Sequence, residues 1–187
     1  IPQIPQDLKD LPDLLRTPLI PAADSPLSEL ISQIQHSDWV RDGKQIMDTH
    51  QDMLGDRCPF CQQQAPQDFS ENLAKLWDRS YDEAVARLQS RLTTLELSLQ
   101  QLSNFKSEIS KHQLKDVAEY SQSAQLDTIE NALSTAHELL VKKLDKQSQS
   151  FDAPEEWDID AFSSTLRQLG ERLNTLVNEH NAKVNDQ

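Results

Sequence analysis

The segment VARLQSRLTTLELSLQQL, residues 85–102, decides the fold expected for this chain. Its apolar side chains recur in steps of three and four residues, at Val85, Leu88, Leu92, Leu95, Leu99 and Leu102. A repeat of this kind places one apolar seam along a helix and is typical of coiled coils. Ile109 continues the phase, with Lys106 at the intervening position. We therefore predict one helix that follows Pro66, begins near Phe69 and runs to about Lys111.

Two more helices are predicted downstream. The first continues the spacing of three and four residues to about Lys146, at Leu126, Ile129, Leu133, Ala136 and Leu140. A loop at 147–156 that contains Pro154 follows it. The second has the same spacing at Ile159, Phe162, Leu166, Leu169, Leu173, Leu176, His180 and Val184. The polar stretch 111–123 is expected to form a bend or a short connecting helix. Both connections allow antiparallel packing. The predicted fold class is all-α, an antiparallel coiled coil or helical bundle.

Composition and charge narrow the functional classes. The chain has 36% hydrophobic residues, 5% aromatic residues and three glycines, which favours helices over sheets. A net charge of −13 repels phosphate backbones, so the surface as a whole disfavours nonspecific nucleic-acid binding. No apolar run approaches the roughly 20 residues that span a bilayer, and no signal-peptide pattern opens the chain. We expect a cytoplasmic protein without membrane contact, and a piece of a larger one.

Residues 1–26 contain six of the nine prolines and form the first of three expected regions. Proline at this density breaks helices, so the segment should be extended, with at most a helical turn around Asp10 to Arg16. Its apolar residues are expected to pack along the helices rather than to serve as a Pro-rich ligand, because no PxxP repeat with basic flanks is present. The second region, 27–66, holds short helices and a cysteine turn, and the third, 67–187, holds the long helices.

The second region should contain two short helices around a turn. The first is expected to start at Ser25-Pro26 and end near His36-Ser37, and the second to run from Lys44 to about Met53 before Gly55. Between them, Trp39-Val40-Arg41-Asp42-Gly43 is expected to be a turn. Trp39 is interpreted as an anchor for the approach to the cysteines rather than a binding platform. A bulky stripe after the cysteines should pack on Trp39 and the short helices: Phe69, Leu73, Leu76, Trp77 and Tyr81.

Cys58-Pro59-Phe60-Cys61 contains the only two cysteines. Cysteines at this spacing on a turn supply two ligands to a tetrahedral zinc ion, which needs four. The sequence holds no second pair, so a homodimer in which two turns share one zinc is the simplest way to complete the site. Histidines are the other candidate ligands: His36 and His50 lie near in sequence, and His112, His137 and His180 lie far away.

Two other interpretations of the cysteine pair remain open. The motif also resembles the active site of glutaredoxins, in which the first thiol begins a helix after a strand. No strand is predicted before Cys58, and Pro66 soon interrupts the chain. The second possibility is two free cysteines on an exposed turn that bind no metal.

The cysteine turn between helical arms resembles the zinc hook of recombination-repair ATPases of the SMC superfamily. The wider order is similar to the middle of bacterial coiled-coil P-loop ATPases related to the anticodon-nuclease group. It comprises Trp39-Val40-x-x-Gly43, Cys58-Pro-Phe-Cys61-Gln62-Gln63, Leu76-Trp77-x-x-Ser80-Tyr81 and Leu176-x-x-x-His180-Asn181. The resemblance implies an ATPase segment whose cysteines bind zinc, join two copies, and couple the nucleotide state to a nucleic-acid or protein target.

The chain departs from these ATPases in two respects. It has no Gly-x-x-x-x-Gly-Lys-Ser/Thr loop, so ATP would be bound outside this chain, which is expected to be noncatalytic. The arm before the cysteines is short and Pro-rich rather than a matching coiled coil. The alternatives in other functional classes are a thiol-redox enzyme centred on Cys58 and a coiled-coil interaction scaffold without metal.

Overall fold

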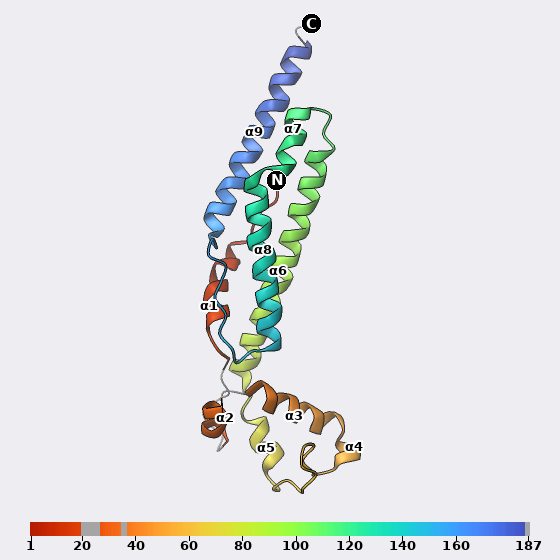
Figure 1. Cartoon of the computed structure of the whole chain (residues 1–187), viewed down its shortest axis with the longest axis vertical. Helices are drawn as coiled ribbons and strands as arrows, with labels where there is room; N and C mark the ends of the chain where they lie inside the picture. The colour runs from red at the N-terminus through yellow and green to blue at the C-terminus, as the bar shows by residue number, and fades with distance from the viewer. Residues whose placement is uncertain (20–26, 35–36, 186–187) are drawn as a thin grey trace. The chain divides into compact units, whose positions relative to one another are not determined.

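A computed structural model describes residues 1–19, 27–34 and 37–185 (Figure 1). Within these ranges the regular structure is helical apart from one isolated bridge between Arg57 and Gln64, which confirms the all-α prediction. The elements are η1 (Gln6–Asp10), α1 (Leu11–Arg16), α2 (Ser28–Ile34), α3 (Ser37–Thr49), α4 (Gln51–Leu54), α5 (Phe69–Ala74), α6 (Arg79–Ser110), α7 (Lys115–Glu119), η2 (Tyr120–Gln122), α8 (Ala124–Asp145) and α9 (Ile159–Asn185). None of the described helices is both long and apolar enough to cross a bilayer.

The described residues divide into two compact units. Unit 1 comprises those within 1–15, 89–141 and 152–187, and unit 2 comprises those within 16–88 and 142–151. Unit 1 therefore holds most of α6 and α8 with α7 and α9. Unit 2 holds the short helices α2 to α5, the cysteines, and residues 142–151 at and after the end of α8.

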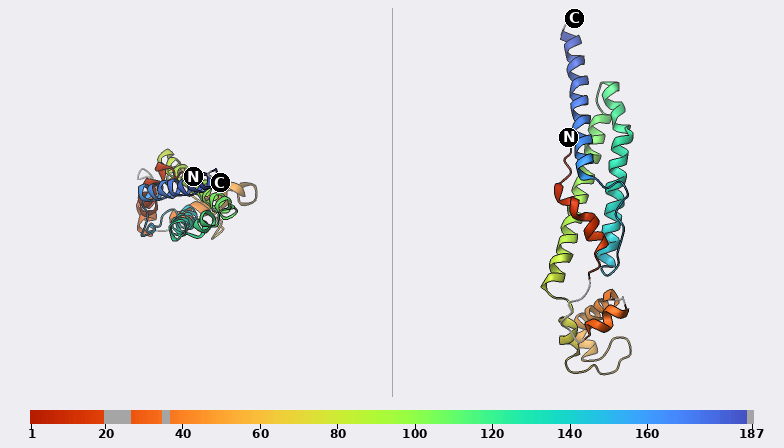
Figure 2. Two further views of the ribbon diagram at one scale, coloured as in Figure 1. Left: turned by 90° about the horizontal axis from the view of Figure 1, so that it is seen from above. Right: turned by 90° about the vertical axis from the view of Figure 1, so that its left-hand side faces the viewer.

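The helices of unit 1 pack in antiparallel order (Figure 1, Figure 2). Lys106 on α6 forms ion pairs with Asp127, at 2.8 Å, and with Glu130 on α8. Further back on α6, Glu96 lies 3.4 Å from His137 on α8. Residue numbers thus fall along one helix as they rise along the other. Lys106, which interrupts the apolar seam, is held at its position by these two carboxylates.

Residues 1–15 of the Pro-rich segment belong to unit 1, where their apolar side chains pack along the helices, as predicted. Ile4, Leu8 and Leu11 are at most 6% exposed. The Arg91 guanidinium of α6 binds Asp10 through two nitrogens, at 2.8 and 2.9 Å. Such a two-point pair fixes both position and orientation. The prediction of an extended segment with at most one helical turn is wrong for 6–16, which form η1 followed by α1. Pro5 precedes η1 and Pro12 lies in the first turn of α1, where proline costs no helical hydrogen bond.

The predicted helix from Phe69 to Lys111 is interrupted at 75–78, where the sequence pattern suggested none. The Asp78 carboxylate accepts hydrogen bonds from the Tyr81 backbone N–H, at 3.1 Å, and from the Ser80 hydroxyl, at 2.6 Å. This is an N-cap, which satisfies donors that a new helix leaves free, so α6 starts at Arg79. The break lets α5 turn Leu73 into the core of unit 2, where it packs with Ile31, Leu76, Leu27, Val40, Met47, Phe69 and Trp77.

The prediction of a turn at Trp39–Gly43 is wrong, because these residues lie inside α3. Gly43 is buried within the helix, where a side chain would collide with another part of the chain. Gly55 does end the next helix, as predicted, and adopts a φ of +58° at the C-cap of α4. The bulky stripe packs on the short helices as expected, but Trp39 stacks on Phe60 of the cysteine turn. The start of the first short helix at Ser25-Pro26 and its end at His36 lie outside the described residues.

Candidate functional site: a cysteine turn seated on a helix

The cysteines lie on a small hairpin in unit 2. The Cys58 N–H donates to the Gln63 carbonyl at 2.8 Å, and the Gln62 N–H donates to the Cys58 carbonyl at 2.9 Å. The Arg57–Gln64 bridge closes the hairpin. Gln62 adopts a φ of 60°, a left-handed conformation that residues other than glycine rarely take. The turn thereby folds back tightly enough for the Cys61 thiol to hydrogen-bond to Cys58.

The hairpin favours the thiolate form of Cys58. The backbone N–H of Cys61, and then that of Phe60, donates to its sulfur and lowers the pKa of the Cys58 thiol, while burial opposes this shift. Both cysteines are free thiols; Cys58 is half-buried and Cys61 is exposed. A thiolate is the form that binds metal and attacks disulfides.

Within the described residues the turn brings together two candidate zinc ligands, whereas a tetrahedral zinc site needs four. They contain no group of three or more His, Cys, Asp and Glu side chains arranged to hold a metal ion. Of the histidine candidates, His137 faces Glu96, and His112 accepts a hydrogen bond from the Leu114 N–H at 3.2 Å. His50 and His180 are exposed, and His36 lies outside the described residues. Cys58 and Cys61 are thus the two candidate ligands that the turn brings together.

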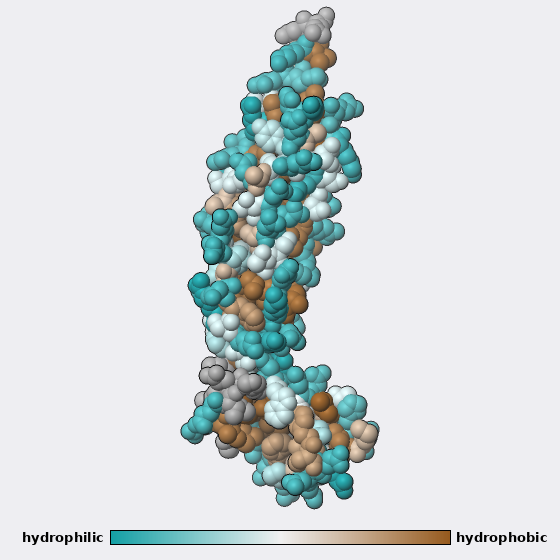
Figure 3. Space-filling view, viewed as in Figure 1, coloured by the Kyte–Doolittle hydropathy of each residue, from teal (hydrophilic) through white to brown (hydrophobic). Residues whose placement is uncertain are grey.

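The turn is seated on α3 through Phe60. The Phe60 ring stacks on Trp39 with centroids 4.6 Å apart and planes inclined by 25°. A Cβ atom at Gly43 would lie 2.8 Å from Cε2 of the same ring. Trp39 therefore contacts the cysteine turn, although it does not bury the large apolar area that an anchoring role predicts. The two residues remain 54% and 53% exposed. Figure 3 shows apolar surface among hydrophilic residues in the part of the molecule that holds the short helices α2 to α5.

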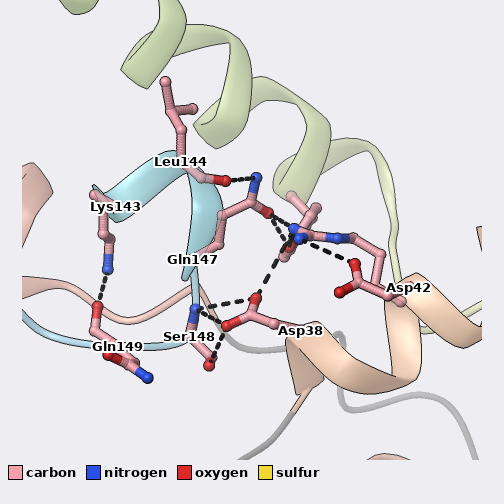
Figure 4. Close-up of polar contacts among 9 residues, drawn as sticks. Asp38, Asp42, Lys143, Leu144, Gln147, Ser148 and Gln149 are labelled. Carbon is pink, nitrogen blue, oxygen red and sulfur yellow. Dashed lines mark hydrogen bonds and ion pairs between the residues drawn. The ribbon is translucent and has the colours of Figure 1, made fainter. Parts of the chain in front are cut away.

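A different face of α3 holds the loop that follows α8 (Figure 4). The Asp38 carboxylate accepts hydrogen bonds from the Ser148 N–H, at 3.1 Å, and from the Ser148 hydroxyl, at 2.6 Å. Close by, the buried Lys143 ammonium donates to the Thr17 carbonyl at 2.8 Å and to the Gln149 carbonyl. The loop is therefore tied to α3 and to the segment after α1.

Gln147 is the centre of this polar junction. Its side-chain oxygen accepts from Arg41 of α3 and from the Tyr81 hydroxyl of α6. Its side-chain nitrogen donates to the Leu144 carbonyl at 3.1 Å, so every polar atom of its amide group is engaged. Burial raises the pKa of Tyr81, which keeps its hydroxyl proton available for donation. The junction joins α3, the start of α6 and the end of α8.

A comparison with protein families matches residues 4–187 to the family described as AAA domain. The chain belongs to the AAA domain family. It is therefore related to P-loop ATPase-like proteins, although its own sequence contains no P-loop motif. No curated protein and no solved structure matches it.

In this member of the AAA domain family, the sequence pattern predicts the cysteine turn but not the residues that support it. The residues 38–43 lie inside α3, but Gly43 favours a turn in the sequence pattern and hides the helix. Gln147 and Ser148 lie in a predicted loop and gave no signal. Their partners include Arg41 and Asp38 of α3, more than a hundred residues earlier in the chain.

Proposed function

We propose that this AAA domain chain is a noncatalytic helical segment of a P-loop ATPase and that its cysteine turn binds zinc together with a second copy. One observation carries the proposal: a preformed turn presents two thiols, one with a lowered pKa, without a third ligand beside them in the described part of the chain. Two such turns supply the four sulfurs of a closed structural zinc site. Zinc would act there as a cross-link and not as a reaction centre.

The helices suggest what the cross-link is for. α6, α8 and α9 have buried apolar seams, as expected of coiled-coil arms. ATP would bind to parts of the protein that carry the P-loop. We infer that the arms couple the nucleotide state to contacts between copies, and through them to a nucleic-acid or protein target in the cytoplasm.

The test is native mass spectrometry of the reduced chain with zinc. We expect a dimer that carries one zinc ion per two chains and dissociates when a chelator is added. Cys58→Ser and Cys61→Ser should each abolish the dimer, because each removes one ligand from both halves of the site. Mild acid should also weaken it, since protons compete with zinc for the sulfurs.

His50→Ala is the matched control, because it removes the nearest described histidine in sequence without touching the turn. It should leave the dimer intact. A zinc-free monomer would overturn the proposal. A monomer with one zinc ion, lost in His50→Ala, would show instead that a single chain completes the site.

A thiol-redox activity centred on Cys58 is the second candidate, because a lowered thiol pKa also favours attack on disulfides. It predicts that Cys61→Ser, which removes the second thiol, traps a mixed disulfide on Cys58 with a small disulfide substrate. A plain interaction scaffold predicts that neither cysteine variant changes assembly or thiol turnover.

A further inference from the structure

We propose that α3 is a connector that seats the cysteine turn on one face and holds the α6–α8 polar junction on another, so that zinc binding and junction stability are coupled. Trp39 and Gly43 are four residues apart and share a helix face, as do Asp38 and Arg41, three residues apart. The first pair contacts Phe60, and the second contacts the loop after α8. The inference rests on the proposed zinc site, although its seat does not require metal.

The seat positions the ligands. Phe60 lies between the two cysteines in sequence, and its backbone N–H donates to the Cys58 sulfur. Its ring is held by Trp39 on one side and fits over the bare backbone of Gly43 on another. A Cβ atom at position 43 would require the ring to move. We expect this movement to disturb the Phe60 donor. Trp39 and Gly43 are therefore positioning residues, which support metal ligands without touching the metal.

The junction fixes α3 itself. Asp38 receives two hydrogen bonds from Ser148, and Arg41 donates to the side chains of Gln147 and Tyr81. All of these contacts lie within unit 2. If metal binding restrains the turn, it restrains α3 and stabilises the junction. By linkage, loosening the junction must weaken metal binding by the same factor.

The first arm of the experiment uses the metal-free chain. Amide hydrogen exchange of Gln62 and Cys58, whose N–H groups close the hairpin, should be faster in Gly43→Val than in the wild type. Gly43→Ala is the finer probe. Alanine favours the helix by about 1 kcal/mol relative to glycine, so this variant adds a Cβ atom without weakening α3 itself. Faster exchange in the turn with unchanged or higher thermal stability separates loss of the seat from general unfolding. Unchanged exchange in both variants would overturn the seat.

The second arm measures affinity with Co²⁺, whose thiolate absorption reports binding. Gly43→Val and Trp39→Ala should weaken Co²⁺ binding about tenfold, the lower end for loss of support around a metal ligand. In a Phe60→Ala background, Gly43→Val should have no further effect, because the ring that it displaces is gone. Wild-type affinity in Gly43→Val would contradict the role of the seat.

The third arm tests the coupling. Zinc should slow hydrogen exchange at Ser148, whose N–H donates to Asp38, and Asp38→Asn should lose this protection and bind Co²⁺ several-fold more weakly. Asp52→Asn on α4 makes the same charge change at a position nearer to the cysteines in sequence, and it should behave as the wild type. Zinc binding without protection at Ser148, or equal weakening in Asp52→Asn, would overturn the coupling. A wild-type chain that binds no metal would overturn the zinc site and the coupling, whereas the metal-free arm would still decide the seat.

Discussion

Lys143 is a charged residue whose side chain is buried. Its ammonium donates to the Thr17 and Gln149 carbonyls. Burial disfavours the charged form and lowers its pKa from 10.5 to about 8, although the Asp38 carboxylate opposes this shift. The residue holds two loop segments together at an electrostatic cost.

That cost predicts a pH dependence of stability. Below pH 8 the lysine is charged in both states and the burial penalty is complete; between pH 8 and 10.5 only the unfolded state keeps the proton, so stability rises with pH. The gain is at most about 3 kcal/mol. Urea unfolding across this range should show the gain in the wild type and in Lys142→Met, an exposed neighbour, but not in Lys143→Met. The same rise in Lys143→Met would assign it to other groups.

Among the helices, α6 begins at a defined capping residue. Asp78 caps it, and the bonds from the Ser80 hydroxyl and Tyr81 N–H lower the pKa of its carboxyl. Asp78→Ala should lower the free energy of unfolding, because it removes the N-cap of α6. Denaturant unfolding measures this, and Asp78→Ser should retain most of the stability because its hydroxyl can accept the same bond. Equal losses in both variants would show that the cap is not the cause.

The seam of α6 makes a second prediction at this scale. Leu95 is fully buried and Leu97, two residues later, is 54% exposed. Leu95→Ala should cost about 2–5 kcal/mol of unfolding free energy, because it removes buried methyl groups and leaves a cavity. Leu97→Ala is the same change on the same helix and should cost less than about 0.5 kcal/mol. Thermal or urea unfolding of both variants checks the register, and similar losses would contradict it.

In the whole molecule, long-range polar bonds complement the apolar seams. Unit 1 combines buried leucines with Arg91–Asp10 and Lys106–Asp127 pairs between distant segments. Unit 2 has a small apolar core and depends on Gln147, Asp38 and their partners to hold its short helices. The cysteine turn lies in unit 2, which has fewer buried apolar residues than unit 1.

The sequence by itself determined the three long helical segments and the position of the cysteine turn, and its connection lengths allowed an antiparallel order. Apolar spacing is a local property, and the two cysteines are close together along the chain. Tertiary structure decided the rest: the break at Asp78, the helical state of Trp39–Gly43, and the junction at Gln147. The helical state of Trp39–Gly43 and the junction depend on distant partners, as when Phe60 covers Gly43 and makes glycine the fitting residue inside a helix, whereas the cap at Asp78 is a local interaction. Local patterns carry no information about such partners, because contacts between distant residues form only when the chain folds.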